Sequence, residues 1–260
     1  MTTYDQQKGP FDRDGFVVIK QPLSSGEFDE LVQNVQRYRN EVVPKFEEGS
    51  DAAMYGNPQR PPESLIRLNH MQTEDTFFEA YARNARWVSL AETMLGEPVT
   101  TANVVWFNKP PRTVHPNHPT PPHQDNFYYS LDPPQLMSVW MALEPVDAEN
   151  GCLRYVAGSH KKGIRPHSTS SIYGFSQGMS EYGLDDWANE VSVRLEPGDM
   201  IVHHSMTIHR ADANESDDRH RPGLSMLFRG DSAKVDEVLH ARHLEQIRQQ
   251  QQKLGRKVTA

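Results

Sequence analysis

The spacing of apolar residues predicts a helical first third of the chain, over about residues 20–96. A short apolar run at 16–19 comes first and is typical of a strand. Ser24 and Glu27 then have the S-x-x-E spacing of a capping box, in which each side chain bonds the other residue's backbone at the start of a helix. Apolar residues follow with the 3.6-residue helical period until Pro44, which ends the predicted helix.

A second helical stretch is predicted over about 75–95, where Gly96 follows the last apolar residue of the period. Beyond it the pattern changes to short apolar runs separated by proline and glycine. Many short strands without alternating helices favour an antiparallel sandwich or barrel over a doubly wound sheet. The strands predicted for this β core, which covers about 99–230, are 99–107, 135–143, 152–156, 191–195, 199–204 and 223–229.

The pattern predicts a C-terminal helix over about 232–254, with Ser232 as its N-cap and acidic residues in the first turn. The 260 residues contain no internal repeat and no long linker, so we expect one domain, 1–260. The predicted architecture is mostly β, with N-terminal and C-terminal helices packed outside a central β core.

Composition limits the compartment and the partners. Asp and Glu outnumber Lys and Arg by 35 to 27, a net charge of −8, so we expect no nucleic-acid or anionic-membrane partner. The single cysteine, Cys152, cannot form an internal disulfide, and a small buried residue in a strand is its ordinary role. No apolar targeting segment or membrane-spanning run is visible. We therefore expect a cytoplasmic protein, and no protein partner is evident.

One short motif indicates metal chemistry. His123-Gln124-Asp125 is a His-x-Asp, and in an extended strand residues i and i+2 point to the same face, so both side chains can reach one ion. An imidazole and a carboxylate are two parts of a facial triad, which needs one more histidine. His243 and Glu245 have the same spacing, but they lie in the predicted C-terminal helix, where such side chains diverge.

The third ligand should come from a distant strand, and the segment after the predicted turn at 197–199 offers three histidines. His203 and His204 are neighbours in the predicted strand 199–204, so at most one of them faces inward. His209 opens a polar stretch that is typical of the rim after a strand. Spacing alone leaves the choice among the three histidines open.

The His-x-Asp motif is part of an ordered series. The series consists of His123-Gln124-Asp125, Trp140, Glu149-Asn150-Gly151-Cys152-Leu153, Gly158-Ser159-His160, Pro197-Gly198-Asp199, His209, Asn214-x-Ser216 and Arg221. Each motif is common by itself, but the collinear set, from about Asn108 to Phe228, is specific. It resembles the phytanoyl-CoA dioxygenase family. The resemblance implies a double-stranded β-helix (a jelly roll, cupin-like), Fe(II) as the metal and 2-oxoglutarate and O₂ as co-substrates. It also implies that His209 completes the ligand set with His123 and Asp125.

The resemblance further implies an arginine for 2-oxoglutarate at the start of the last core strand, where a guanidinium can pair with the far carboxylate. Arg221 leads directly into this strand and shares a face with Gly223 and Ser225. Gly223 would leave room for the ligand, and Ser225 could add a hydrogen bond. Arg219 stays an alternative, although the two aspartates just before it can hold it on the surface.

Lys109 and Trp140 are further candidates for contact with the co-substrate. Lys109 lies at a strand end, from which its ammonium could reach a 2-oxoglutarate carboxylate, but a solvated loop lysine is an equal interpretation. Trp140 matches a tryptophan that the family has near the co-substrate, yet a tryptophan in a strand usually belongs to the core.

The substrate side is less clearly marked. Phe127, Tyr128 and Tyr129 come just after the metal motif and are candidates for a substrate wall or for ordinary packing. The segment 165–187, rich in Ser, Gly and Tyr, is the predicted lid, and Arg165 at its start is a candidate for substrate binding.

We expect an Fe(II)/2-oxoglutarate-dependent dioxygenase that hydroxylates a small organic molecule, with release of succinate and CO₂. The same iron centre could instead catalyse desaturation, ring closure or alcohol oxidation. A non-catalytic jelly-roll binding protein is an alternative from another class, but three retained ligands and a candidate arginine argue against it. A zinc hydrolase with the same triad would be distinguished by turnover without O₂. The motifs do not identify the substrate.

Overall fold

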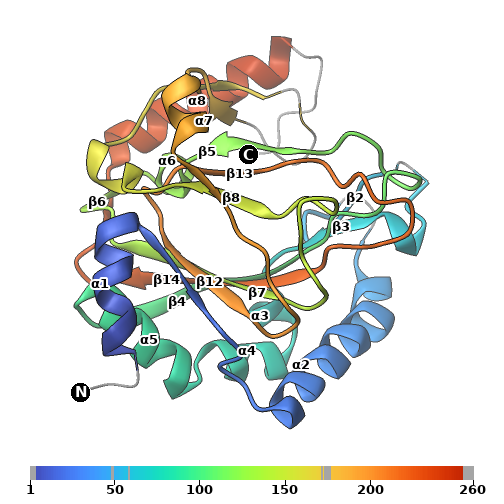
Figure 1. Ribbon diagram of the computed structural model, residues 1–260. Helices are drawn as coiled ribbons and strands as arrows, with labels where there is room; N and C mark the ends of the chain where they lie inside the picture. The colour runs from blue at the N-terminus through green and yellow to red at the C-terminus, as the bar shows by residue number, and fades with distance from the viewer. Residues whose placement is uncertain (1–3, 48–49, 58, 171, 173–176, 254–260) are drawn as a thin grey trace.

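Two antiparallel sheets face each other at the centre of the protein in the computed structural model, which describes residues 4–47, 50–57, 59–170, 172 and 177–253 (Figure 1). The larger sheet has the strand order β1 (Phe16–Ile19), β12 (Met200–His204), β7 (Leu136–Ala142), β14 (Gly223–Gly230), β4 (Val99–Phe107), β3 (Leu65–Leu68) and β2 (Ala53–Tyr55). The smaller sheet has the order β11 (Glu190–Ser192), β8 (Leu153–Val156), β13 (His209–Ala211) and β5 (Thr120–His123). Two short strand pairs complete the β structure: β6 (Leu131–Asp132) with β15 (Lys234–Val235), and β9 (His167–Thr169) with β10 (Gln177–Met179).

Helices from the first part of the chain cover the outer face of the larger sheet (Figure 1). They are α1 (Asp5–Asp14), α2 (Ser25–Arg37), α3 (Met71–Glu74), α4 (Thr76–Ala82) and α5 (Ala85–Leu95). Three further helices, α6 (Asp125–Tyr129), α7 (Leu184–Ala188) and α8 (Glu237–Lys253), lie on the side of the smaller sheet. Short turns of other helix types are Tyr38–Val42, Val43–Lys45, Pro62–Ser64 and Ser159–Lys162. No helix among the described residues is long and apolar enough to span a membrane.

The alternation of side chains along β4 separates two regions of the interior. Val104 and Trp106 are fully buried in the main core, between the larger sheet and the helices. Val105 and Phe107 point to the other face, toward the smaller sheet. The space between the two sheets is therefore lined by every second residue of the larger sheet, and it holds the candidate site.

The helical part follows the sequence prediction in outline, with three differences. Ser24 and Glu27 form the predicted capping box at the start of α2. The predicted stretch 75–95 is two helices, because the Asn84 side chain accepts a hydrogen bond from the Arg86 backbone (3.0 Å) and begins a new helix there. The structure also adds α1, and it adds β2 and β3, which the sequence pattern did not indicate.

The predicted N-cap of the C-terminal helix was wrong. α8 begins at Glu237, and the Asp236 carboxylate accepts hydrogen bonds from the backbone N–H groups of Val238 (3.0 Å) and Leu239 (2.9 Å). Ser232 instead donates a side-chain hydrogen bond to Glu97 (2.7 Å), ahead of β15. The carboxylate is the better cap because a negative charge at a helix N-terminus also interacts favourably with the helix dipole.

Candidate metal centre and its cavity

The side chains of His123, Asp125 and His209 meet between the two sheets. Their potential ligand atoms lie within 4.8 Å of one another. Asp125 Oδ1 is 3.4 Å from His123 Nε2 and 3.7 Å from His209 Nε2. The two imidazoles lie side by side because β13 pairs with β5 and places His209 directly opposite His123. Two imidazoles and one carboxylate that occupy one face of a metal ion are the ligand set of a facial triad, so these residues fit Fe(II).

The backbone reaches this arrangement differently from the prediction. The His-x-Asp motif is not wholly in a strand: β5 ends at His123, and Asp125 is the first residue of α6. Gln124 between them is still extended, with φ −119° and ψ 127°, which keeps the two side chains on one side. Gln124 is fully buried, and its amide donates to the Met206 carbonyl (2.8 Å). His209, expected at a rim after a strand, opens the short strand β13.

Both candidate imidazole ligands are oriented by the backbone. His123 Nδ1 lies 2.8 Å from the Pro121 carbonyl oxygen, and His209 Nδ1 lies 3.0 Å from the Thr207 carbonyl oxygen. A carbonyl oxygen can only accept, so Nδ1 carries the proton in each ring, and the lone pair that could bind a metal lies on Nε2. This is the usual way in which a protein fixes the tautomer of a metal-binding histidine.

Two side chains from the neighbouring strands β7 and β12 contact the same oxygen, Oδ2, of the Asp125 carboxylate. Ser138 Oγ donates to Asp125 Oδ2 (3.0 Å), and His203 Nε2 lies 3.2 Å from the same oxygen. The other nitrogen of His203 is 3.1 Å from the Tyr155 hydroxyl. If the hydroxyl donates to Nδ1, Nε2–H donates to the carboxylate, and the chain of hydrogen bonds is satisfied. Oδ2 is thereby occupied, and Oδ1 is the oxygen left for a metal.

The electrostatics suit a cation site. Burial alone would raise the pKa of Asp125, but His209, His123 and His203 around it outweigh this and hold its pKa well below the usual range. Burial, followed by the neighbouring His123 ring, holds the pKa of His209 well below the ordinary value. The carboxylate is therefore ionised and the His209 ring neutral at neutral pH, as metal ligands need to be.

His203 and His204 point to opposite faces, so only one of these neighbours faces inward, as predicted. His203 lines the cavity, opposite Ser138 in the pairing of β12 with β7. His204 packs near the rings of Phe11 and His160, and its Nδ1 accepts a hydrogen bond from the Met206 backbone (3.1 Å). The hydrogen bond from His203 to the carboxylate was not foreseen, because only the strand pairing reveals which residue lies behind Asp125.

A cavity of about 350 Å³ opens beside the cluster. Its walls come from both sheets and from α6. Besides the three candidate ligands, it is lined by Met54, Ile66, Arg67, Val105, Phe107, Asn108, Lys109, His118, Thr120, Tyr128, Tyr129, Ser138, Trp140, Leu153, His203, Arg221, Ser225 and Leu227.

Two buried cations, Arg221 and Lys109, lie together at this cavity. Their backbones pair across the extended ends of β14 and β4, with Arg221 N donating to Lys109 O (3.1 Å). The Arg221 side chain is 4% exposed, its Nε has no hydrogen-bond partner, and its guanidinium lies 5.1 Å from the Trp140 ring. Lys109 is buried, not solvated, and its Nζ donates to the His118 carbonyl (2.7 Å).

Burial lowers the pKa of Arg221 to about 10, and burial followed by the nearby Arg221 charge holds the pKa of Lys109 well below its usual range. Among the described residues, neither cation has a carboxylate in ion-pair contact. A dicarboxylate that presents one end here would supply the missing negative charge. Ser225 and Trp140 line the same part of the cavity. The predicted use of Gly223 was wrong: a Cβ there would overlap the Trp140 indole, so the space belongs to this side chain and not to a ligand.

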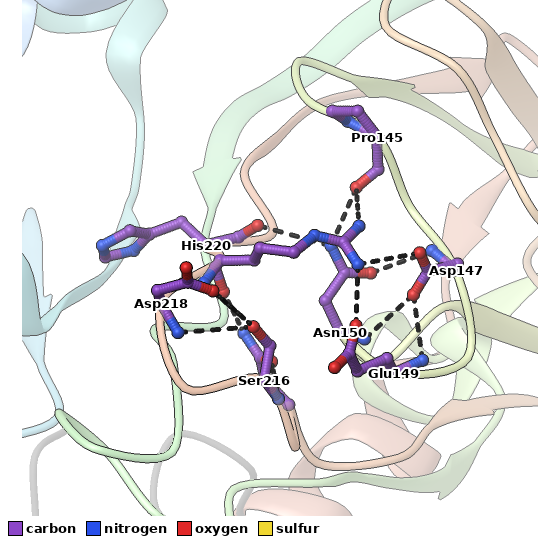
Figure 2. A network of polar contacts seen from close by, with 9 residues as sticks. Pro145, Asp147, Glu149, Asn150, Ser216, Asp218 and His220 are labelled. Carbon is purple, nitrogen blue, oxygen red and sulfur yellow. Dashed lines mark hydrogen bonds and ion pairs between the residues drawn. The ribbon is translucent and has the colours of Figure 1, made fainter.

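Arg219, the alternative arginine, pairs with two partly exposed carboxylates. Figure 2 labels Pro145, Asp147 and Glu149, which accept hydrogen bonds from its guanidinium. Its guanidinium donates to Asp147 (2.9 Å) and Glu149 (3.0 Å), and to the Pro145 carbonyl (3.3 Å). The expectation that the two aspartates just before it would hold it was wrong, because these are occupied by Arg112 and Ser216 instead. Arg219 is not among the residues that line the cavity.

The predicted substrate residues divide into two groups. Tyr128 and Tyr129 line the cavity. Phe127 does not: its ring stacks on His167 (centroids 4.0 Å apart) and contacts His243 of α8 (4.2 Å). Arg165 does not line the cavity either, because its guanidinium pairs with Asp186 (2.7 Å) and donates to the Glu181 carbonyl. Arg165 thus connects parts of the predicted lid segment, of which residues 171 and 173–176 lie outside the described residues.

The remaining motif residues shape loops. Asn150 accepts a hydrogen bond from the Asp147 backbone and donates to the Pro145 and His220 carbonyls, contacts that Figure 2 shows. Gly151 has a φ of +80°, a left-handed conformation that glycine adopts without strain. Asn214 donates to the Lys109 carbonyl (2.9 Å) and so helps to hold the backbone of the cavity lysine.

Comparison with solved structures identifies the class of fold. The epimerase SnoN, in complex with Fe³⁺, alpha ketoglutarate and nogalamycin RO, aligns with a TM-score of 0.71 at 21% identity, over 92% of this chain and 88% of SnoN. EctD from S. alaskensis, with 2-oxoglutarate and 5-hydroxyectoine, aligns with a TM-score of 0.70 at 16% identity, over 91% of this chain and 78% of EctD. The protein thus shares the fold of these non-haem iron enzymes.

Sequence comparison then identifies the family. The profile of phytanoyl-CoA dioxygenase (PhyH) matches residues 11–223. The chain belongs to this family. Peroxisomal phytanoyl-CoA dioxygenase of Rattus norvegicus is 26% identical over 219 residues, which cover 81% of this chain and 64% of the rat protein. Phytanoyl-CoA dioxygenase domain-containing protein 1 of Mus musculus is 28% identical over 169 residues, 62% of this chain and 57% of the mouse protein. The chain therefore spans less than two thirds of the length of these curated relatives.

Proposed function

We propose that the protein is an Fe(II)/2-oxoglutarate-dependent dioxygenase that hydroxylates a small organic molecule, with release of succinate and CO₂. One observation carries the proposal: a facial set of two imidazoles and a carboxylate shares its cavity with two buried cations that have no carboxylate partner among the described residues. The first group fits Fe(II), and the second fits the far carboxylate of 2-oxoglutarate. Family membership supports the same function. The fold we propose is a double-stranded β-helix, a jelly roll, within one domain, 1–260.

His123, Asp125 and His209 would hold the metal, and bound Fe(II) with 2-oxoglutarate would supply the activation of O₂. Arg221 and Lys109 would bind the far carboxylate of 2-oxoglutarate, with Ser225 and Trp140 beside it. Ser138 and His203 hold one oxygen of Asp125, which favours a carboxylate that binds through Oδ1 alone and leaves the other positions open. The substrate would lie near Tyr128 and Tyr129, which line the same cavity.

The same centre could support desaturation, ring closure or alcohol oxidation, since the outcome depends on which substrate atom lies next to the metal. Solved structures of similar fold include an epimerase and a carbocyclase. A binding protein without activity is disfavoured by the complete donor set and by the unpaired cations. We further propose a cytoplasmic location and small molecules as the partners, in keeping with the net charge of −8.

Substitution of each candidate ligand tests the proposal. His123→Ala, Asp125→Ala and His209→Ala should each abolish succinate formation from 2-oxoglutarate and weaken Fe(II) binding, with the fold retained by circular dichroism. His204→Ala and His243→Ala are the controls, because these histidines lie outside the cavity, and both should keep activity. Wild-type activity in the His209 variant would exclude the triad. Turnover with Zn(II) under nitrogen would instead support a hydrolase.

A further inference from the structure

Tyr155 is a fully buried tyrosine whose ring lies against a candidate metal ligand. It stands on β8, directly opposite His209 of β13, and the two rings are stacked with their centroids 5.6 Å apart and an interplanar angle of 20°. Phe16 of β1 is stacked on the same ring, at 4.6 Å and 17°. The phenol is shut off from bulk water, so its hydroxyl needs a hydrogen-bond partner within the protein.

The partner of the Tyr155 hydroxyl is His203, whose Nδ1 lies 3.1 Å away. His203 belongs to the other sheet, where it stands on β12 opposite Ser138 of β7. The bond between tyrosine and histidine thus joins the smaller sheet, which carries Tyr155 beside a candidate imidazole ligand, to the larger sheet, which carries both partners of Asp125 Oδ2. It is a link between the two sheets at the candidate metal centre.

The direction of each hydrogen bond in this chain follows from the group at its end. His203 Nε2 lies 3.2 Å from Asp125 Oδ2, and an ionised carboxylate only accepts, so Nε2 carries the proton. In a neutral imidazole the lone pair is then on Nδ1, and the Tyr155 hydroxyl is the donor. A flip of the ring about its Cβ–Cγ bond would break both bonds. The hydroxyl therefore fixes the plane of the imidazole that contacts the carboxylate.

We propose that Tyr155 is a positioning residue of the metal centre. Its hydroxyl holds the His203 ring, and His203 in turn holds Asp125 with Oδ1 turned to the metal. The inference rests on the proposed function, which places the metal at Asp125 and the two candidate imidazole ligands. Without the hydroxyl, imidazole and carboxylate sample further orientations, and the metal binds only to the fraction of molecules in the competent one. A tyrosine with a purely structural role here would need only its ring, which phenylalanine also supplies.

The test removes the hydroxyl and keeps the ring. Tyr155→Phe is combined with His203→Phe in a double-mutant cycle, and the Fe(II) affinity of all four proteins is measured by anaerobic titration. Tyr38→Phe is the matched control, because Tyr38 is also fully buried and its hydroxyl has no hydrogen-bond partner among the described residues. Tyr38 packs in the main core, between the larger sheet and the helices.

Tyr155→Phe should weaken Fe(II) binding by about 3–10-fold, the range expected when one buried hydrogen bond no longer favours the competent orientation. In the His203→Phe background the same substitution should change the affinity by less than about 2-fold, because the residue through which it acts is gone. Tyr38→Phe should bind Fe(II) like wild type. Three results would each overturn the inference: wild-type affinity in Tyr155→Phe, an equal loss in both backgrounds, or the same loss in Tyr38→Phe.

The ring nitrogens of His203 give a second measurement, on the metal-free protein. Nitrogen NMR with isotope-labelled histidine distinguishes a protonated nitrogen, a lone pair that accepts a hydrogen bond and a free lone pair. In wild type, Nε2 should be protonated and Nδ1 should accept a hydrogen bond, and the signals are assigned by their loss in His203→Phe. In Tyr155→Phe, the Nδ1 signal should move to that of a free lone pair. A protonated Nδ1 in wild type would overturn the inference, even if Tyr155→Phe failed to fold.

Failure of the proposed function has a different signature. If wild type binds Fe(II) but forms no visible charge-transfer band with 2-oxoglutarate, the oxygenase assignment is wrong, and the cycle still judges Tyr155. If wild type binds no Fe(II), the oxygenase assignment is also wrong, and the cycle is measured with Zn(II), which accepts the same types of ligand. The pattern described above with Zn(II) would support the positioning role. A wild-type protein that binds neither metal would overturn it.

Discussion

Replacing Arg221 with methionine should stabilise the ligand-free protein and weaken its binding of 2-oxoglutarate. Arg221 is 4% exposed, and its guanidinium lacks an anionic partner among the described residues. Burial lowers its pKa to about 10, and at about 1.36 kcal/mol per pKa unit this costs the charged form about 3 kcal/mol relative to the unfolded chain. Methionine removes this cost, keeps an unbranched apolar stem and relieves the repulsion on Lys109.

The gain is reduced because the stacking of Arg221 on Trp140 is lost, which is worth about 1–2 kcal/mol when desolvated. The net stabilisation should be about 1–2 kcal/mol, or a rise of about 2–8 °C in the unfolding temperature of the metal-free protein for a chain of this size. The Michaelis constant for 2-oxoglutarate should rise by about 30-fold or more, since one arm of a buried charge pair costs about 2–5 kcal/mol.

Scanning calorimetry without metal and succinate assays over a range of 2-oxoglutarate concentrations measure the two effects. Arg219→Met is the control, because Arg219 is held at the surface by Asp147 and Glu149. It should leave the Michaelis constant unchanged and the unfolding temperature unchanged or slightly lower. If Arg221→Met unfolds at a lower temperature than the control, or keeps the wild-type Michaelis constant, the reasoning from an unpaired buried charge is refuted.

Three further predictions follow from contacts around the site. His203→Phe should weaken Fe(II) binding by about 10–100-fold in anaerobic titrations, because Asp125 loses a hydrogen bond behind the metal, and unchanged affinity would contradict this role. Gly223→Ala should lower the free energy of unfolding by about 1–3 kcal/mol in urea, since its Cβ overlaps Trp140, and a wild-type value would show that the indole can move away. Burial lowers the pKa of His204 to about 4, so the unfolded chain takes up a proton below about pH 6.5 that the folded protein excludes. The free energy of unfolding of the metal-free protein should therefore fall as the pH is lowered from about 6.5 to 4. The fall should be less steep in His204→Asn, which keeps an acceptor for the Met206 backbone N–H. An equal dependence on pH in both proteins would show that His204 does not cause the loss of stability.

Features that depend on neighbours along the chain could be predicted from the sequence. The capping box of Ser24 and Glu27 formed as expected, because both partners lie within one helical turn. The predicted strands of the β core recur in the structure with ends shifted by a few residues. Strand parity brought His123 and Asp125 to one side, even though α6 begins at Asp125, because the extended backbone at Gln124 sets their directions.

What lies across the sheets was decided by tertiary structure. Spacing left three histidines open, and the pairing of β13 with β5 brings His209 beside His123, whereas β12 turns His203 toward the back of the carboxylate. The sequence likewise left two arginines as candidates, and only the structure distinguishes them: Arg221 is buried at the cavity, whereas Arg219 forms an ion pair with Asp147. Arg67 lies on a strand that no pattern indicated, because β3 is four residues long and is defined by its pairing with β4. A sequence shows the period of local structure, but the partner of a strand is chosen by packing and hydrogen bonding between distant segments, and these decide which charges share a cavity.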